Sequence, residues 1–196
     1  MKFVIVSGNP KKDGLSRSMT DEIIRGAQDG GAEVEEINVC NQERCHMCNG
    51  GAGKCLSDDH VCMFGKDGFT EAQEKIKEAD AVAFISPVYW EEVSEGLKGF
   101  MDRFRRCESS MFFNPRQAAL TNKPVLLVAS AGGSGMDMLE PLMQMERFAH
   151  HTGARVFDEI GINRWNQSYK GQAIYRAARA MAEGHAVGET ISYELS

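Results

Sequence analysis

Apolar runs of strand length alternate with amphipathic stretches along the chain. The candidate strands lie at 2–6, 32–39, 81–86, 124–130 and 154–162. The first, third and fourth runs are almost continuous Val, Ile, Leu, Phe and Ala, which is typical of central strands in a parallel sheet covered on both faces. The second and fifth runs contain charged residues, so we expect them at the edges of the sheet.

Helical patterns separate these strands. The candidate helices lie at 16–29, 70–79, 93–107, 134–151 and 169–184. In the third helix, Val93, Leu97 and Phe100 recur at spacings of four and three, which predicts one buried face, and Arg103 is expected on the solvated face. Strands alternating with helices predict an α/β fold with right-handed crossovers. We therefore expect a flavodoxin-like three-layer sandwich whose five-stranded parallel sheet has the order 2-1-3-4-5.

The length and composition fit a single globular domain over residues 1–196. The net charge is -6 and the basic residues are scattered, which argues against a nucleic-acid partner. No run approaches the roughly 20 uninterrupted apolar residues of a membrane span. The N-terminal MKFVIV is too short for the apolar part of a signal peptide, so we interpret it as a strand and expect a cytoplasmic protein without a membrane partner.

Three unusual loops follow the first, third and fourth strands, and parallel strands bring such loops to one edge of the sheet. SGNPKKDGLS leads into a helix and offers backbone N–H groups and hydroxyls to a phosphate; the alternative is a plain loop with a serine cap. SPVYWEEVS places Tyr89 and Trp90 where they could flank a planar ring; the alternative is packing in the core or at a subunit interface. SAGGSG lets the backbone approach a flat ligand closely.

These loops resemble those of the NAD(P)H-dependent FMN reductase family, whose members include iron-sulfur flavoproteins. GNPKKDGLS is similar to the family's phosphate loop, and SPVYWEEVSEGLKGFMDR is similar to its most specific segment. The resemblance covers most of the chain. It departs at Asn9, Lys11 and Leu15, where the family often has Ser, Arg and Asn.

The resemblance implies which residues bind FMN. The phosphate would lie against Asn9, Lys11, the backbone of Leu15, and Ser16. The isoalloxazine would lie against Pro87, Val88, Tyr89 and Trp90, and the third loop, Ser130, Ala131, Gly132, Gly133 and Ser134, would close over it. The implied activity is electron transfer from NADH or NADPH through FMN to a small-molecule or protein acceptor, with no catalytic side chain required.

Five of the six cysteines, Cys40, Cys45, Cys48, Cys55 and Cys62, fall in one short segment of the predicted loop at 40–68. Iron-sulfur flavoproteins are similar here, with a run close to C-x2-C-x2-C-x5-C. Three cysteines match its last three members, and its first member falls on Gln42. A cluster usually needs four thiolates, so we expect Cys40, or otherwise Cys62, as the fourth ligand to an iron-sulfur cluster.

Two alternatives to a cluster remain open for this segment. Cys45, Cys48 and Cys55 with either His46 or His60 could instead hold zinc, because that metal takes four sulfur or nitrogen ligands. The cysteines could also be free thiols without a metal.

Two other functions remain open on the same fold. The chain could be an electron carrier that holds FMN without using a nicotinamide directly, or a non-catalytic module, because a fold does not fix a function. A flavin bound by residues of one subunit alone would be open to solvent, so we expect a homodimer or homotetramer. The loop at 108–122, with Met111 and Phe112, is expected to cover a neighbouring subunit.

Overall fold

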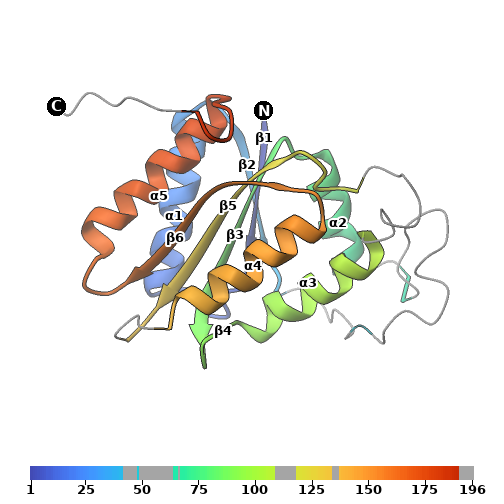
Figure 1. Cartoon of the computed structure of the whole chain (residues 1–196), viewed down its shortest axis with the longest axis horizontal. Coiled ribbons are helices and arrows are strands. Elements are labelled where there is room, and N and C mark those ends of the chain that lie inside the picture. The colour runs from blue at the N-terminus through green and yellow to red at the C-terminus, as the bar shows by residue number, and fades with distance from the viewer. Residues whose placement is uncertain (42–47, 49–63, 66, 109–117, 134–136, 190–196) are drawn as a thin grey trace.

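The computed structural model describes residues 1–41, 48, 64–65, 67–108, 118–133 and 137–189 (Figure 1). Its elements are β1 (Lys2–Ser7), α1 (Leu15–Asp29), β2 (Glu33–Asn38), α2 (Gly68–Glu78), β3 (Ala81–Tyr89), β4 (Glu92–Val93), α3 (Glu95–Glu108), β5 (Pro124–Ala131), α4 (Leu139–His151), β6 (Arg155–Asn163) and α5 (Gln167–Ala182). Most of the predicted subunit contact at 108–122 lies outside the described residues, so the oligomeric state stays a prediction.

The sheet has the order β2-β1-β3-β5-β6, and these five strands are parallel. This is the predicted order 2-1-3-4-5, because β4 is a short strand that pairs antiparallel with the end of β3. The α/β, flavodoxin-like prediction is therefore confirmed. None of the described helices is long and apolar enough to cross a membrane.

Helices cover both faces of the sheet (Figure 1). In β1, Phe3 and Ile5 pack with residues of α1 and α5, whereas Val4 and Val6 pack with residues of α2, α3 and α4. This split follows from the period of two along a strand, which turns successive side chains to opposite faces. It explains why the central strands are apolar at almost every position.

Two of the five predicted helix starts, those at 93 and 134, are wrong. Val93 belongs to β4, where it pairs with Val88, and the hydroxyl of Ser94 accepts a hydrogen bond from the N–H of Leu97, so the helix α3 begins at Glu95. The helix α4 begins at Leu139. Pro141 lies in its first turn, and a proline deeper in the helix would clash with the carbonyl four residues earlier.

Candidate functional site

The carboxyl ends of β1, β3 and β5 meet at one edge of the sheet. The N–H of Gly8, just after β1, donates to the carbonyl of Ile85 at 2.8 Å. At the start of α1, the hydroxyl of Ser16 lies 2.6 Å from that of Ser130, which also donates to the carbonyl of Ser86 at 3.4 Å. All three serines are buried. Hydrogen bonds between buried groups thus join the carboxyl ends of β1, β3 and β5 and the start of α1, where the three predicted loops begin or end.

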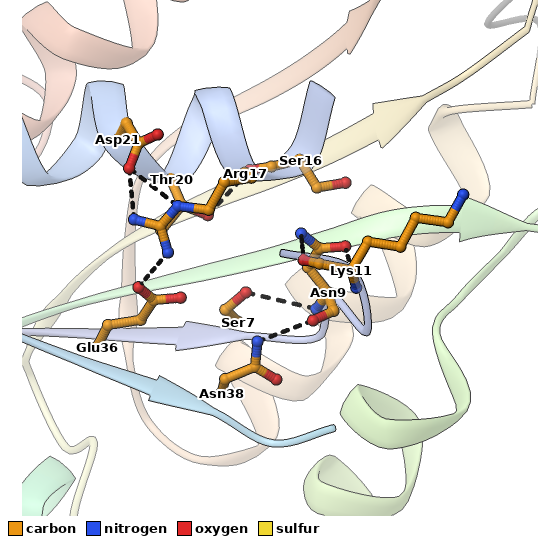
Figure 2. Close-up of polar contacts among 9 residues, drawn as sticks. All are labelled: Ser7, Asn9, Lys11, Ser16, Arg17, Thr20, Asp21, Glu36 and Asn38. Carbon is orange, nitrogen blue, oxygen red and sulfur yellow. Dashed lines mark hydrogen bonds and ion pairs between the residues drawn. The ribbon is translucent and has the colours of Figure 1, made fainter. Parts of the chain in front are cut away.

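The loop between β1 and α1 is shaped by Asn9, which is only 4% exposed. Its side-chain amide donates to the carbonyl of Lys11 at 2.7 Å and accepts from the N–H of Lys11 at 3.2 Å. The amide of Asn38, at the end of β2, donates to the carbonyl of Asn9 at 2.8 Å. Figure 2 shows the Lys11 side chain extending away from these contacts. Asn9 therefore holds the loop in shape, and Lys11 presents its charge outward.

A cleft of about 460 Å³ lies beside this loop, and its lining residues are Asn9, Lys11, Lys12, Arg17, Glu36, Asn38 and Asn41. Arg17 donates from Nη1 to Glu36 at 2.6 Å and also pairs with Asp21, whose hydrogen bond is the main cause of the raised pKa of Arg17 (Figure 2). Three basic side chains against one carboxylate make the lining net positive. The cleft suits an anionic group such as a phosphate.

The first turn of α1 leaves its backbone donors open. The helix begins at Leu15 after Gly14, no side chain of the described residues caps its N-terminus, and its first turn contains no acidic residue. The unpaired N–H groups at a helix start and the positive end of the helix dipole both attract anions. The predicted backbone contribution of Leu15 is consistent with this position.

A strained hairpin follows β3. Trp90 and Glu91 have φ of 51° and 66°, in the left-handed region, and form its tip between the paired residues Tyr89 and Glu92. Two-residue hairpin turns of this kind favour Asn and Gly, because a left-handed backbone crowds a Cβ. Trp90 is 98% exposed and Tyr89 is 43% exposed, so the alternative of packing in the core is wrong, whereas packing at a subunit interface stays a prediction. The hairpin instead holds two aromatic side chains out at the edge of the sheet.

We expect Glu91→Gly to raise the free energy of unfolding by about 0.5 to 1 kcal/mol. Relief of the left-handed strain contributes roughly 1 to 2 kcal/mol, and the greater freedom of glycine in the unfolded chain offsets part of it. Glu92→Gly is the matched control. Glu92 lies in β4, so the same change there should lower the free energy of unfolding of the protein. Urea unfolding measures both variants, and a loss of stability in Glu91→Gly would contradict the prediction.

The other residues of the predicted ring site differ in how far a ligand can approach them. Pro87 is buried and Val88 is half-buried at the end of β3. Beyond β5, Gly132 and Gly133 are exposed, and a Cβ on Gly133 would meet no atom of the described residues within 4 Å. Ala131 is the last residue of β5, and Ser134 lies outside the described residues. The described part of the glycine loop therefore leaves its backbone accessible to a flat ligand.

Of the four predicted metal ligands, only Cys40 and Cys48 are among the described residues; Cys45 and Cys55, and the alternative Cys62, lie outside them. The described residues contain no group of three side chains that could hold a metal ion. The cysteine segment's ligand set therefore stays a prediction.

Cys40 is half-buried against the start of α3. Its sulfur would lie 2.5 Å from a Cβ on Gly96, so that position accepts only glycine without movement. Burial raises the pKa of the Cys40 thiol, although hydrogen bonds with Ser94 and the backbone of Gly96 act in the opposite direction. As a metal ligand, Cys40 would have to leave these contacts and lose its proton.

Comparison with known proteins agrees with this geometry. The family described as NADPH-dependent FMN reductase matches residues 1–166. The chain is 32% identical over 103 residues to an iron-sulfur flavoprotein of Archaeoglobus fulgidus, covering 53% of this chain and 45% of the relative. It is 34% identical over 110 residues to an iron-sulfur flavoprotein of Methanocaldococcus jannaschii, covering 54% and 52%. The chain thus spans about half the length of these curated relatives.

A solved structure has the same fold. The NAD(P)H:quinone oxidoreductase of Methanothermobacter marburgensis superposes with a TM-score of 0.69 at 18% identity, covering 95% of this chain and 99% of that one. At this level of identity the likeness supports the fold alone.

Proposed function

Because the chain belongs to the NADPH-dependent FMN reductase family, we propose that it is an FMN-dependent oxidoreductase that takes electrons from NADH or NADPH. The acceptor is a small molecule or a protein. The observation that carries the proposal is that buried serines join the carboxyl ends of β3 and β5 to the start of α1, which no side chain of the described residues caps. A phosphate and a planar ring can both be held there.

The residues at this edge fit the parts of FMN. Lys11 and the open N–H groups at the start of α1 offer positive charge and donors to the phosphate. Val88, Tyr89 and Trp90 offer apolar surface to the ring, and Gly132 and Gly133 leave room for it on the other side. When bound, FMN supplies the capacity to accept a hydride and to release electrons singly or in pairs. The chain itself must bind and orient the ring, and no side chain has to act as a nucleophile.

We expect Ser16→Ala to weaken FMN binding by about tenfold to a hundredfold, because a hydrogen bond to a charged phosphate is worth roughly 1.5 to 3 kcal/mol. In the structure the Ser16 hydroxyl pairs with that of Ser130, so we expect the FMN phosphate to replace this partner when it binds. Ser18→Ala is the control, since the Ser18 hydroxyl is exposed on the same helix. Quenching of FMN fluorescence during titration into flavin-free protein measures both affinities, and equal affinities would remove Ser16 from the site.

Anaerobic kinetics test the activity itself. Purified protein loaded with FMN should oxidise NADH or NADPH when a quinone or ferricyanide is supplied as acceptor. Bound FMN without oxidation of either nicotinamide would indicate an electron carrier. Failure to bind FMN would indicate a non-catalytic module on the same fold.

We also propose that the cysteine segment holds an iron-sulfur cluster that exchanges electrons with the flavin. The names of two relatives as iron-sulfur flavoproteins and the gathering of five cysteines favour this. The ligands would be Cys45, Cys48 and Cys55 with Cys40, or with Cys62 if Cys40 keeps its contacts with α3. A cluster would let the protein pass electrons one at a time to its acceptor.

A further inference from the structure

A fourth loop reaches the same edge of the sheet, from β6. The register of the last two strands pairs Ser130 with Ile162 and Ala131 with Asn163. The residues after Asn163 therefore continue beside the glycines that follow Ala131. The side chain of Arg164 confirms this, because its Nη2 lies 3.8 Å from where a Cβ on Gly132 would stand.

This loop is held by side-chain hydrogen bonds to its own backbone. The side-chain oxygen of Asn163 accepts from the N–H groups of Trp165 and Asn166 at 3.0 and 3.1 Å, and that of Asn166 accepts from the N–H of Asn163 at 2.8 Å. Lys170 in α5 donates to the carbonyl of Gly161 at 2.6 Å. The loop is thus fixed before any ligand arrives, which lowers the entropy lost on binding.

The fixed loop presents a cation and aromatic surface to solvent. Arg164 is exposed and forms no ion pair with any residue in the described ranges. Trp165 is 71% exposed, and Tyr169, in the first turn of α5 just after the loop, is 63% exposed. Arginine binds phosphate groups through two parallel hydrogen bonds, and an exposed indole offers a face on which a flat base can stack.

We propose that Arg164 and Trp165 bind the phosphate-bearing and adenine-bearing half of the reduced nicotinamide dinucleotide, so that its nicotinamide reaches the flavin across Gly132. This inference rests on the proposed function. The cationic cleft is the weaker candidate for the dinucleotide, because its lining includes Glu36 and Asn38 of β2, and β2 and β6 are the outermost strands on opposite sides of the sheet. The flavin phosphate and the dinucleotide would then enter from different sides.

Arg155 provides a matched control for Arg164. It is also exposed, and it is the first residue of β6, at the other end of the strand from Arg164. Arg164→Gln and Arg155→Gln remove the same charge. Calorimetric titration of the FMN-loaded protein with NAD⁺ and NADP⁺ should show affinity reduced by about tenfold to a hundredfold in Arg164→Gln, and by less than about twofold in Arg155→Gln.

The two probes distinguish which phosphate is bound. An equal loss for NAD⁺ and NADP⁺ would assign Arg164 to the pyrophosphate, and a loss for NADP⁺ alone would assign it to the 2′-phosphate. Equal affinities of Arg164→Gln and Arg155→Gln for both probes would overturn the proposal. In a Trp90→Phe background, Trp165 is the remaining tryptophan, and its fluorescence should be quenched by NADP⁺. An unchanged signal would overturn the assignment of Trp165.

The result also separates this inference from the proposed function. A wild-type protein that oxidises NADPH, with an unaffected Arg164→Gln variant, would refute only the role of Arg164. A wild-type protein that binds FMN but neither binds nor oxidises a nicotinamide dinucleotide would refute the proposed use of nicotinamide and this inference with it.

Discussion

Arg103→Met lowers the free energy of unfolding by about 3 to 5 kcal/mol, because it leaves a largely buried carboxylate without its counter-charge. The Arg103 side chain is fully buried, and its Nη1 and Nη2 donate to the two oxygens of Asp67 at 2.7 and 3.2 Å. Its guanidinium also lies 4.2 Å from the centre of the Phe69 ring. Methionine preserves much of the apolar packing, so the loss reports the missing charge and hydrogen bonds.

The loss should depend on pH. Burial by itself raises the pKa of Asp67, but the hydrogen bonds and charge of Arg103 outweigh it and hold the pKa below the ordinary value of 3.8. A carboxyl with a lowered pKa stabilises the fold above its unfolded pKa, and this contribution is lost as the pH falls through the folded pKa. The difference between wild type and Arg103→Met is therefore full at neutral pH and shrinks as the pH falls and Asp67 takes up a proton in the folded proteins.

Urea unfolding at neutral and acidic pH measures this effect. Arg105→Met is the control, because Arg105 is exposed on the same helix and should change stability by no more than about 0.5 kcal/mol. A pH-independent difference, or a loss in Arg103→Met no larger than in the control, would show that the pair with Asp67 does not stabilise the fold.

The same contacts explain how the end of the cysteine segment is fixed. Asp67 accepts hydrogen bonds from the N–H groups of Phe69 and Thr70, so it caps α2 while it pairs with Arg103 in α3. At the other end of the segment, Cys40 packs against Gly96 at the start of α3. Both ends of the segment are thus anchored to one helix.

The sequence predicted the strand order well, because strands buried on both faces are apolar at nearly every position. It did not predict the burial of Arg103, which was expected on a solvated face. The periodicity of one helix cannot reveal a partner that lies 36 residues away in the chain. The pair of Arg17 and Glu36, which helps to form the cleft, was missed for the same reason.

The sequence indicates candidate site residues only in loops whose composition differs from that of an ordinary turn. The glycine and proline loops after the first, third and fourth predicted strands stand out, and hydrogen bonds in the structure join Ser16, Ser86 and Ser130 in the elements beside them. The loop after β6 has no such composition, and the charged residues of its strand indicate only a position at the side of the sheet. Its place beside Gly132 follows from the pairing register of β5 and β6, which no local pattern encodes. Lys12, Asn38 and Asn41 were likewise missed, since their common cleft forms only on folding.

Cys48→Ser should remove the iron and sulfide from anaerobically purified protein while FMN remains bound. The reason is that a cluster in this segment depends on thiolates that close around it, and serine at one of the central positions breaks the ligand set. Cys107→Ser is the control, because Cys107 is the one cysteine outside the segment, and it should retain the iron. Metal analysis, acid-labile sulfide and the broad absorption beyond the flavin bands are the measurements.

The fourth ligand can be identified in the same way. Cys40 is the predicted choice, yet its thiol is half-buried beside Ser94 and Gly96 and has a pKa raised by burial, so ligation would require Cys40 to leave its contacts at the start of α3. Loss of iron in Cys40→Ser with retention in Cys62→Ser would show that this release occurs, and the reverse result would assign Cys62. Stoichiometric zinc, or wild-type protein that takes up no iron on reconstitution, would refute the cluster and leave a flavin oxidoreductase whose cysteines serve another purpose.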